Sequence, residues 1–254
     1  MNFSKAIVRR PGRSIINGLS MSSHSALDYE RALAQHARYS KALEYCGLEV
    51  QTLAPLEAYP DSTFVEDVAI LTPEAAIITA PGAPSRRGEV EAIESVLETY
   101  YARIEKIHAP GTLEGGDVMQ IGRSFYIGLS KRTNPFGAEQ LVTILKKIGV
   151  TALPVPETGF LHLKTAVTYV GRNTILVAEG FVPPKELEGF DKIQVPRAEH
   201  PAANCILING KILMPAGFPK TRELIERLET EIVEVDISEF AKIDGGLTCL
   251  SLRF

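Results

Sequence analysis

Five polar residues recur along the chain at nearly regular separations, each beside an apolar stretch. Glu66, Glu114, His162, Asn204 and Cys249 follow one another at separations of 48, 48, 42 and 45 residues. The stretches that contain them are FVEDVAIL, LEGGDVMQI, LHLKTAVTYV, AANCILIN and GLTCLSL. A nearly constant period of this length indicates a repeated supersecondary unit. If the units are arranged around an axis, the five positions converge on it.

The types of these side chains favour nucleophilic chemistry over packing. Taken alone, Cys249 is better interpreted as a buried thiol and His162 as a satisfied, partly buried histidine. Acids, however, are almost never buried unless they are paired. A thiol, a histidine and two acids at equivalent positions are therefore better explained by catalysis. The sequence predicts Cys249 as a nucleophile, whereas Asn204 is expected to hold turn backbone through its side chain.

The elements that must position these residues are short strands and helices. Strands are predicted at residues 75–79, 125–128, 174–178 and 211–215 from β-branched content and bounding turns. One helix is predicted after Asn134, which occupies an N-cap position before Pro135, and Gly149 follows its last turn. A second helix carries Val90, Ile93 and Leu97 at helical spacing. The chain is therefore interpreted as a single catalytic domain, 1–254, with approximate units 1–56, 57–107, 108–155, 156–197 and 198–254.

Composition excludes several classes of function. The net charge of −4 provides no basic surface for nucleic acid. No stretch approaches the ~18 apolar residues that a membrane span requires, and the first residues lack the pattern of a signal peptide. The three cysteines, Cys46, Cys205 and Cys249, have no CxxC spacing, which argues against a zinc site or a disulfide framework. A reduced, soluble, cytoplasmic protein is expected.

Several motifs together carry a family resemblance that spans the whole chain. FVEDVAI, GTLEGGDV, LHLKT, KILMPAG and IDGGLTCLSLRF resemble the dimethylarginine dimethylaminohydrolases of the pentein, or guanidino-group-modifying, superfamily. The resemblance implies an α/β fold: a five-fold pseudosymmetric propeller of ββαβ-type units around a central active site. It also implies hydrolysis of Nω-methylated L-arginine to L-citrulline and methylamine or dimethylamine, with no metal or organic cofactor. A homodimer is implied as well.

The resemblance also assigns residues. Cys249 is the implied nucleophile, His162 the general acid and base, and Glu114 the carboxylate that orients it. The implied substrate contacts are Asp67 and Glu66 for the guanidinium, Arg86 and Arg132 for the α-carboxylate, and Asp61 with the carbonyls of Leu19 and Ile243 for the α-amino group. Gly245 and Gly246 are expected to let backbone approach a ligand closely. Residues 17–26 have the composition of a lid that closes over substrate.

Two other functions remain open from sequence. An arginine deiminase would act on unmethylated arginine, but those enzymes are longer and usually carry an acid two residues after the histidine, where this chain has Lys164. Loss of that acceptor favours a methylated nitrogen, which has fewer N–H donors. The second alternative is a non-catalytic binding protein for arginine derivatives, although binding alone needs no thiol. The remaining histidines, His24, His36, His108 and His200, are expected at the surface or in loops.

Overall fold

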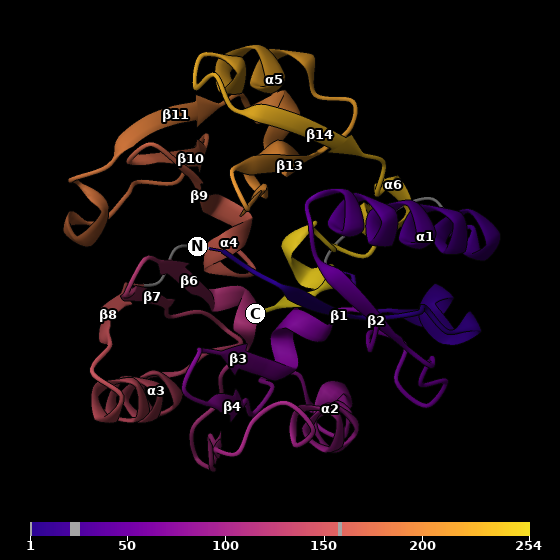
Figure 1. Ribbon diagram of the computed structural model, residues 1–254, viewed down its shortest axis with the longest axis vertical. Coiled ribbons are helices and arrows are strands. Elements are labelled where there is room, and N and C mark those ends of the chain that lie inside the picture. Colours follow the sequence, from indigo (N-terminus) through magenta and orange to yellow (C-terminus); the bar gives the residue numbers. More distant parts are fainter. Residues whose placement is uncertain (1, 21–25, 157–158) are drawn as a thin grey trace.

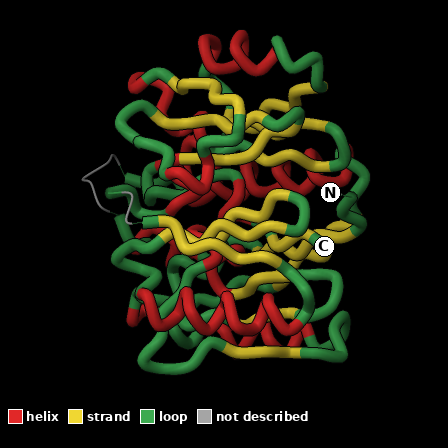
Figure 2. The backbone as a smooth tube through the Cα atoms, turned by 90° about the vertical axis from the view of Figure 1, so that its left-hand side faces the viewer, coloured by secondary structure: helices red, strands yellow, loops and turns green. Residues whose placement is uncertain are grey.

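Five three-stranded sheets form a ring around a common centre. The computed structural model describes residues 2–20, 26–156 and 159–254, and within these ranges the longer helices α1, α2, α3 and α5 lie on the outside of the ring (Figure 1). Seen from the side, most strands lie roughly along one common axis of the molecule (Figure 2). The predicted five-fold α/β architecture is confirmed.

Each sheet is built in the same order. Its middle strand pairs antiparallel with one neighbour and parallel with the other, and a connection over the outside leads to the parallel strand. Four of the sheets have an α-helix in this connection, as in the predicted ββαβ unit, whereas between residues 178 and 191 the connection contains only the short turn Lys185–Leu187. The four sheets formed from consecutive strands are β3 (Ala69–Leu71), β4 (Ala76–Ile78) and β5 (Ile104–Lys106); β6 (Val118–Ile121), β7 (Ser124–Gly128) and β8 (Thr151–Val155); β9 (Val167–Gly171), β10 (Thr174–Ala178) and β11 (Asp191–Val195); and β12 (Ile206–Ile208), β13 (Lys211–Pro215) and β14 (Glu231–Val235).

The remaining sheet joins distant parts of the sequence. Its middle strand β1 (Lys5–Arg9) pairs with β2 (Glu49–Leu53) on one side and with β15 (Leu252–Arg253) on the other. Backbone of Phe254 also bonds with Lys5 and Ser4. This unit therefore takes one strand from the predicted segment 198–254, and the five unit boundaries stay predictions.

The two helices predicted above, after Asn134 and around Ile93, are present. The α-helices of the described part of the chain are α1 (Tyr29–Tyr45), α2 (Glu89–Leu97), α3 (Pro135–Lys147), α4 (Leu163–Ala166), α5 (Pro219–Glu226) and α6 (Ser238–Ala241). At the start of α3, the Asn134 side chain accepts a hydrogen bond from the Gly137 amide, which satisfies one of the donors that a helix start leaves open. Gly149 has a φ of +70°, so this position favours glycine. The predicted cap residues are confirmed.

The apolar core fills the space between neighbouring sheets and the outer helices. The inward face of α1 includes Ala32, His36, Tyr39 and Leu43, which recur at helical spacing. His36 is therefore buried, and burial lowers its pKa to about 4, so it stays neutral. The expectation of a surface or loop position for His36 was wrong because the helical register points it inward. His24 lies outside the described residues.

The inner strand of each sheet follows a short helical turn. These turns are Val65–Val68, Gly115–Asp117, Leu163–Ala166, Arg197–Ala203 and Thr248–Leu250. The five recurring polar residues lie on these turns or at their ends, so the repeat places them around the centre of the ring. Within the described residues, no helix is long and apolar enough to cross a membrane.

Candidate active site

A cavity of about 140 Å³ lies at the centre of the ring. It brings together most of the residues predicted from sequence. Its walls include Cys249, His162, Glu114, Asp67, Arg86, Arg132, Asp61, Leu19 and Ile243. These residues come from all parts of the sequence, and the turns that begin the inner strands supply the side chains at its centre.

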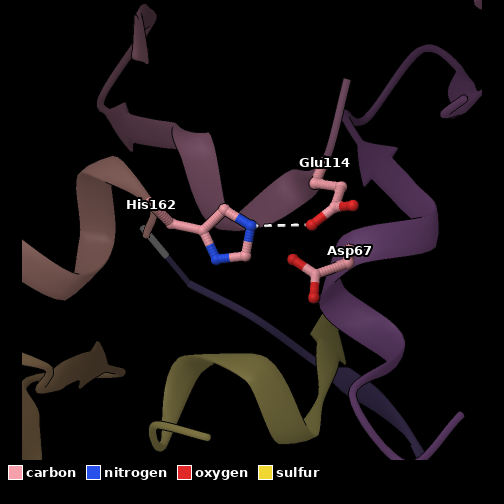
Figure 3. Close-up of side chains that lie close together, drawn as sticks. All are labelled: Asp67, Glu114 and His162. Carbon is pink, nitrogen blue, oxygen red and sulfur yellow. Dashed lines mark hydrogen bonds and ion pairs between the residues drawn. The ribbon is translucent and has the colours of Figure 1, made fainter. Parts of the chain in front are cut away.

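Glu114 and His162 form a buried pair. The Nε2 atom of His162 lies 2.8 Å from Oε2 of Glu114, and neither side chain is more than 7% exposed (Figure 3). Burial alone would lower the histidine pKa, but Asp67, Glu114 and Asp117 outweigh it and raise the pKa to about 9. Burial would raise the pKa of Glu114, but the hydrogen bond and charge of His162 lower it to about 2. The resting pair is therefore a carboxylate and an imidazolium.

Asp67 stands beside this pair and is held from two sides. Its Oδ1 accepts a hydrogen bond of 2.9 Å from the Gly116 amide, and its Oδ2 lies 2.5 Å from Nη1 of Arg86. A Cβ added to Gly116 would lie 2.6 Å from Nδ1 of His162 and 3.0 Å from Oδ1 of Asp67. Glycine is required here because backbone, histidine and acid converge on one point.

Cys249 lies on a turn whose backbone is tied on several sides. Asn204 accepts a hydrogen bond from the Thr248 amide at 2.9 Å and donates to the Thr248 hydroxyl and the Lys164 carbonyl, so it has the predicted structural role. Burial, together with the charges of Asp67 and Glu66, raises the pKa of the Cys249 thiol to about 12. The thiol is therefore neutral in the unliganded site at pH 7, and a bound cation would lower its pKa.

The same cavity is lined by groups predicted to bind the amino-acid end of the substrate. Asp61 accepts a hydrogen bond from the Leu19 amide at 2.9 Å, which joins two of the three predicted ligands of the α-amino group. Arg132 is 19% exposed along its side chain and lies 3.3 Å from Oε1 of Glu114. Part of the predicted lid, residues 21–25, falls outside the described residues, whereas Ser20 donates to the Lys242 carbonyl.

Arg86 differs from Arg132 in its surroundings. Its guanidinium is 5% exposed and bonds both oxygens of Glu89, Oδ2 of Asp67 and the carbonyls of Asp61 and Phe64. Nearly all of its donors are therefore engaged by the protein. Contact between Arg86 and a substrate carboxylate stays a prediction.

Glu66 does not belong to the lining of the central cavity. Its Oε1 pairs with Lys164 at 2.6 Å and with Arg253 at 3.0 Å, and it lines a different cavity of about 160 Å³. Its Oε2 is buried and has no hydrogen-bond partner among the described residues. The predicted contact of Glu66 with a guanidinium stays a prediction, because the observed partners are cations of the protein.

The sequence interpretation missed two buried acids behind the site. Asp117 accepts hydrogen bonds from the Leu163 amide at 2.9 Å and the Ser130 hydroxyl at 2.7 Å, and so links the backbone beside His162 to the turn that carries Arg132. Glu89 holds Arg86. Asp117 could have been noticed from the sequence, because it directly precedes an apolar strand as Asp67 does. Glu89 had no such signal, because it resembles any acid in the first turn of a helix.

The acids and the histidine could also serve as metal ligands by spacing alone. Ligand-type atoms of Asp67, Glu114 and His162 lie within 4.8 Å of one another. His162 would first have to lose its proton, and Asp67 already pairs with Arg86. The charge pattern suits a cation that also donates hydrogen bonds, such as a guanidinium.

Comparison with known proteins agrees with this geometry. The family model described as "N,N dimethylarginine dimethylhydrolase, eukaryotic" matches residues 18–251. The chain is 48% identical to the N(G),N(G)-dimethylarginine dimethylaminohydrolase of Pseudomonas aeruginosa, over 99% of this chain and 100% of that protein. The chain belongs to the dimethylarginine dimethylaminohydrolase family.

Other members and structures extend the comparison. The N(G),N(G)-dimethylarginine dimethylaminohydrolase of Streptomyces coelicolor is 38% identical over 100% of this chain and 98% of its own. The C249S mutant of the Pseudomonas aeruginosa dimethylarginine dimethylaminohydrolase, complexed with citrulline, superposes with a TM-score of 0.98 at 47% identity, and each chain is covered completely. The N-terminal domain of ArgZ, a cyanobacterial arginine dihydrolase, shares the fold, with a TM-score of 0.86 at 17% identity over 98% of this chain and 97% of that domain.

Proposed function

We propose that this chain hydrolyses Nω-methylated L-arginine to L-citrulline and methylamine or dimethylamine, with Cys249 as the nucleophile. The observation that carries the proposal is the cavity in which Cys249, His162, Glu114 and Asp67 line one space. Membership of the dimethylarginine dimethylaminohydrolase family and the citrulline complex of a 47% identical relative support the same reaction.

Substrate binding prepares the nucleophile. Asp67 and Glu114 attract the guanidinium, whose charge is otherwise delocalised over three nitrogens, and they favour attack at its carbon. The bound cation also offsets the acids that raise the pKa of Cys249. Thiolate formation therefore follows substrate entry, which restricts the reactive form to the occupied site.

The two chemical steps use one histidine twice. Thiolate attack on the guanidinium carbon gives a tetrahedral adduct, and the imidazolium of His162 protonates the departing amine. The carbon–nitrogen bond breaks and leaves a covalent S-alkylthiouronium. The neutral imidazole then takes a proton from water as the water attacks the same carbon, and the carbon–sulfur bond breaks to release citrulline. Glu114 fixes the ring orientation for both steps through its 2.8 Å hydrogen bond.

The surroundings of Lys164 favour a methylated substrate over arginine. Its ammonium group pairs with Glu66 at 2.6 Å, so this position supplies a cation where deiminases usually supply an acid. An unsubstituted guanidinium has more N–H donors to satisfy, and an unmet donor in a buried site costs about 1–3 kcal/mol. A deiminase activity is the second candidate, and a binding protein without catalysis is the third.

Turnover of two substrates separates these candidates. Purified protein is incubated with asymmetric dimethylarginine and, separately, with L-arginine, and citrulline and the released amine are quantified. We expect citrulline and dimethylamine from the first substrate, no product from the second, and no turnover by a Cys249→Ser variant. Product from arginine alone would establish a deiminase, and tight binding without product would establish a binding protein.

Two further properties belong to this proposal. We infer a cytoplasmic location and a homodimer, which cell fractionation and light scattering of the purified protein test. The Leu19 amide donates to Asp61 and the Ser20 hydroxyl to the Lys242 carbonyl; closure of residues 17–26 over substrate stays a prediction.

A further inference from the structure

The turn that carries Cys249 is supported from behind by the next strand. Nη1 of Arg253 lies 3.2 Å from the Thr248 carbonyl, 2.9 Å from the Ser251 carbonyl and 2.7 Å from the Ser251 hydroxyl. Tyr39 reaches the same turn from α1, at 2.9 Å from the Leu247 carbonyl and 2.6 Å from the Ser251 hydroxyl. A helical turn leaves carbonyls without partners, and here Arg253 and Tyr39 satisfy them on both sides of Cys249.

Arg253 also sets the charge beneath the nucleophile. Its Nη2 lies 3.0 Å from Oε1 of Glu66, the oxygen that Lys164 also contacts. Glu66, Lys164 and Arg253 together carry one negative and two positive charges in a largely buried place, because their side chains are 5%, 11% and 12% exposed. Without Arg253, the charges of Glu66 and Lys164 would cancel, and the group would have no net positive charge.

Side-chain alternation explains why this residue reaches the centre. In β15, Leu252 is buried in the apolar cluster around Ile7 and Val65, so the next side chain points to the opposite face. The forked, planar guanidinium can contact carbonyls with one nitrogen and a carboxylate with the other, which an ammonium group cannot do at the same positions.

We propose that Arg253 is a positioning residue for the reaction: it fixes the turn of Cys249 and counters the charge of Glu66, so that the thiolate forms when substrate binds. The inference rests on the proposed role of Cys249. Other charged groups surround the thiol as well: Asp67, Glu66 and Lys164 act on it electrostatically, and the same cavity is lined by His162, Glu114, Asp244, Asp61, Arg86 and Arg132. Arg253 differs from them because it contacts both the turn and an acid.

The test compares Arg253→Met with Arg253→Lys. The rate of Cys249 alkylation by 2-chloroacetamidine is measured against pH, and kcat and KM are measured with asymmetric dimethylarginine. The alkylation midpoint is the pH at which this rate is half of its maximum. For Arg253→Met we expect the midpoint to rise by about one pH unit, so that the alkylation rate below it falls about tenfold. We also expect kcat to fall by a larger factor than KM rises. For Arg253→Lys, which keeps the charge, we expect the wild-type midpoint with a reduced kcat.

Arg222→Met is the matched control, since Arg222 is an exposed arginine that also pairs with two acids, Glu226 and Glu234. It is expected to match wild type in both assays. A folded Arg253→Met with the wild-type midpoint and kcat would overturn the proposal. If that variant does not fold, Arg253→Lys decides: a lower kcat supports the positioning role, and a wild-type kcat overturns it.

The alkylation assay distinguishes a failure of this proposal from a failure of the proposed function. If wild type is labelled at Cys249 but turns over neither substrate, the proposed function fails, and the shift of the alkylation midpoint in Arg253→Met still supports or overturns the role of Arg253.

Discussion

His162 and Glu114 occupy equivalent points of adjacent units, each at the residue that precedes a short helical turn, and they meet through one 2.8 Å hydrogen bond. Both backbones are extended at this point, with φ and ψ of −140° and 160° for His162 and −119° and 141° for Glu114. The pseudosymmetry thus brings two copies of one backbone position face to face. The sequence has a histidine at one copy and a glutamate at the other.

The His162–Glu114 pair predicts how stability depends on pH. Because the folded pKa of His162, about 9, lies above its unfolded value of ~6.5, the stabilisation is complete below pH ~6.5 and is lost as the pH rises through 9. Urea unfolding of wild type and of His162→Gln at several pH values measures this stabilisation. The difference in the free energy of unfolding should shrink between pH 6.5 and 9; a constant difference would contradict the pairing.

Cys249 should distinguish charged from uncharged reagents. Burial and nearby acids raise its pKa to about 12, so an uncharged alkylating agent meets a neutral thiol at pH 7, whereas a cationic amidine offsets the acids. We expect 2-chloroacetamidine to label Cys249 at least tenfold faster than iodoacetamide does, after each rate is divided by that of free cysteine. Mass spectrometry of the labelled peptide follows both reactions, and equal corrected rates would argue against the charge effect.

Gly116→Ala should remove activity while the protein stays folded. The added methyl group would fall 2.6 Å from Nδ1 of His162 and would push the ring out of line with Glu114. A misplacement of ~1 Å can cost about 10²-fold in rate, so we expect a loss of kcat of that order. Gly189→Ala is the control, because a Cβ there meets nothing within 4 Å among the described residues. Comparable activity of the two variants would sink this interpretation.

Arg86 and Arg132 should respond differently to replacement by leucine. Arg86→Leu leaves Asp67 and Glu89 buried without their cation, which we expect to destabilise the fold by about 3–5 kcal/mol. Arg132→Leu leaves Glu114 paired with His162, so we expect a stable protein whose KM for dimethylarginine rises about tenfold or more. Chemical unfolding and steady-state kinetics measure the two effects. A stable Arg86→Leu with only a raised KM would reverse the assignment.

Local signals predicted the elements well, and the repeat predicted where they converge. The cap at Asn134 and the strand at residues 174–178 depend on neighbours in sequence, so both could be predicted without knowledge of tertiary contacts. The repeat then placed Glu114, His162 and Cys249 around one axis. No such pattern reports a residue's distant partners, which is why the hydrogen bond from the Leu163 amide to Asp117 was missed.

The orientation of two adjacent acids could not be predicted from the sequence. Glu66 and Asp67 follow each other in a turn with three residues per revolution, so their side chains point in directions about 120° apart. Asp67 therefore faces the cavity while Glu66 faces Lys164 and Arg253 below it. Sequence places both acids at the centre of the ring but cannot orient them, because orientation depends on which neighbour supplies a counter-charge.

The pairing of β15 with β1 has a consequence for synthesis. A growing chain exposes Lys5–Arg9 first, yet the strand that completes that sheet, and the turn with Cys249 before it, emerge only when residues up to Phe254 have left the ribosome. Four of the five sheets can form from consecutive residues while translation continues. The ring can close only once this segment has emerged, so a nascent chain that lacks it can present the acids and the histidine but not the thiol of Cys249.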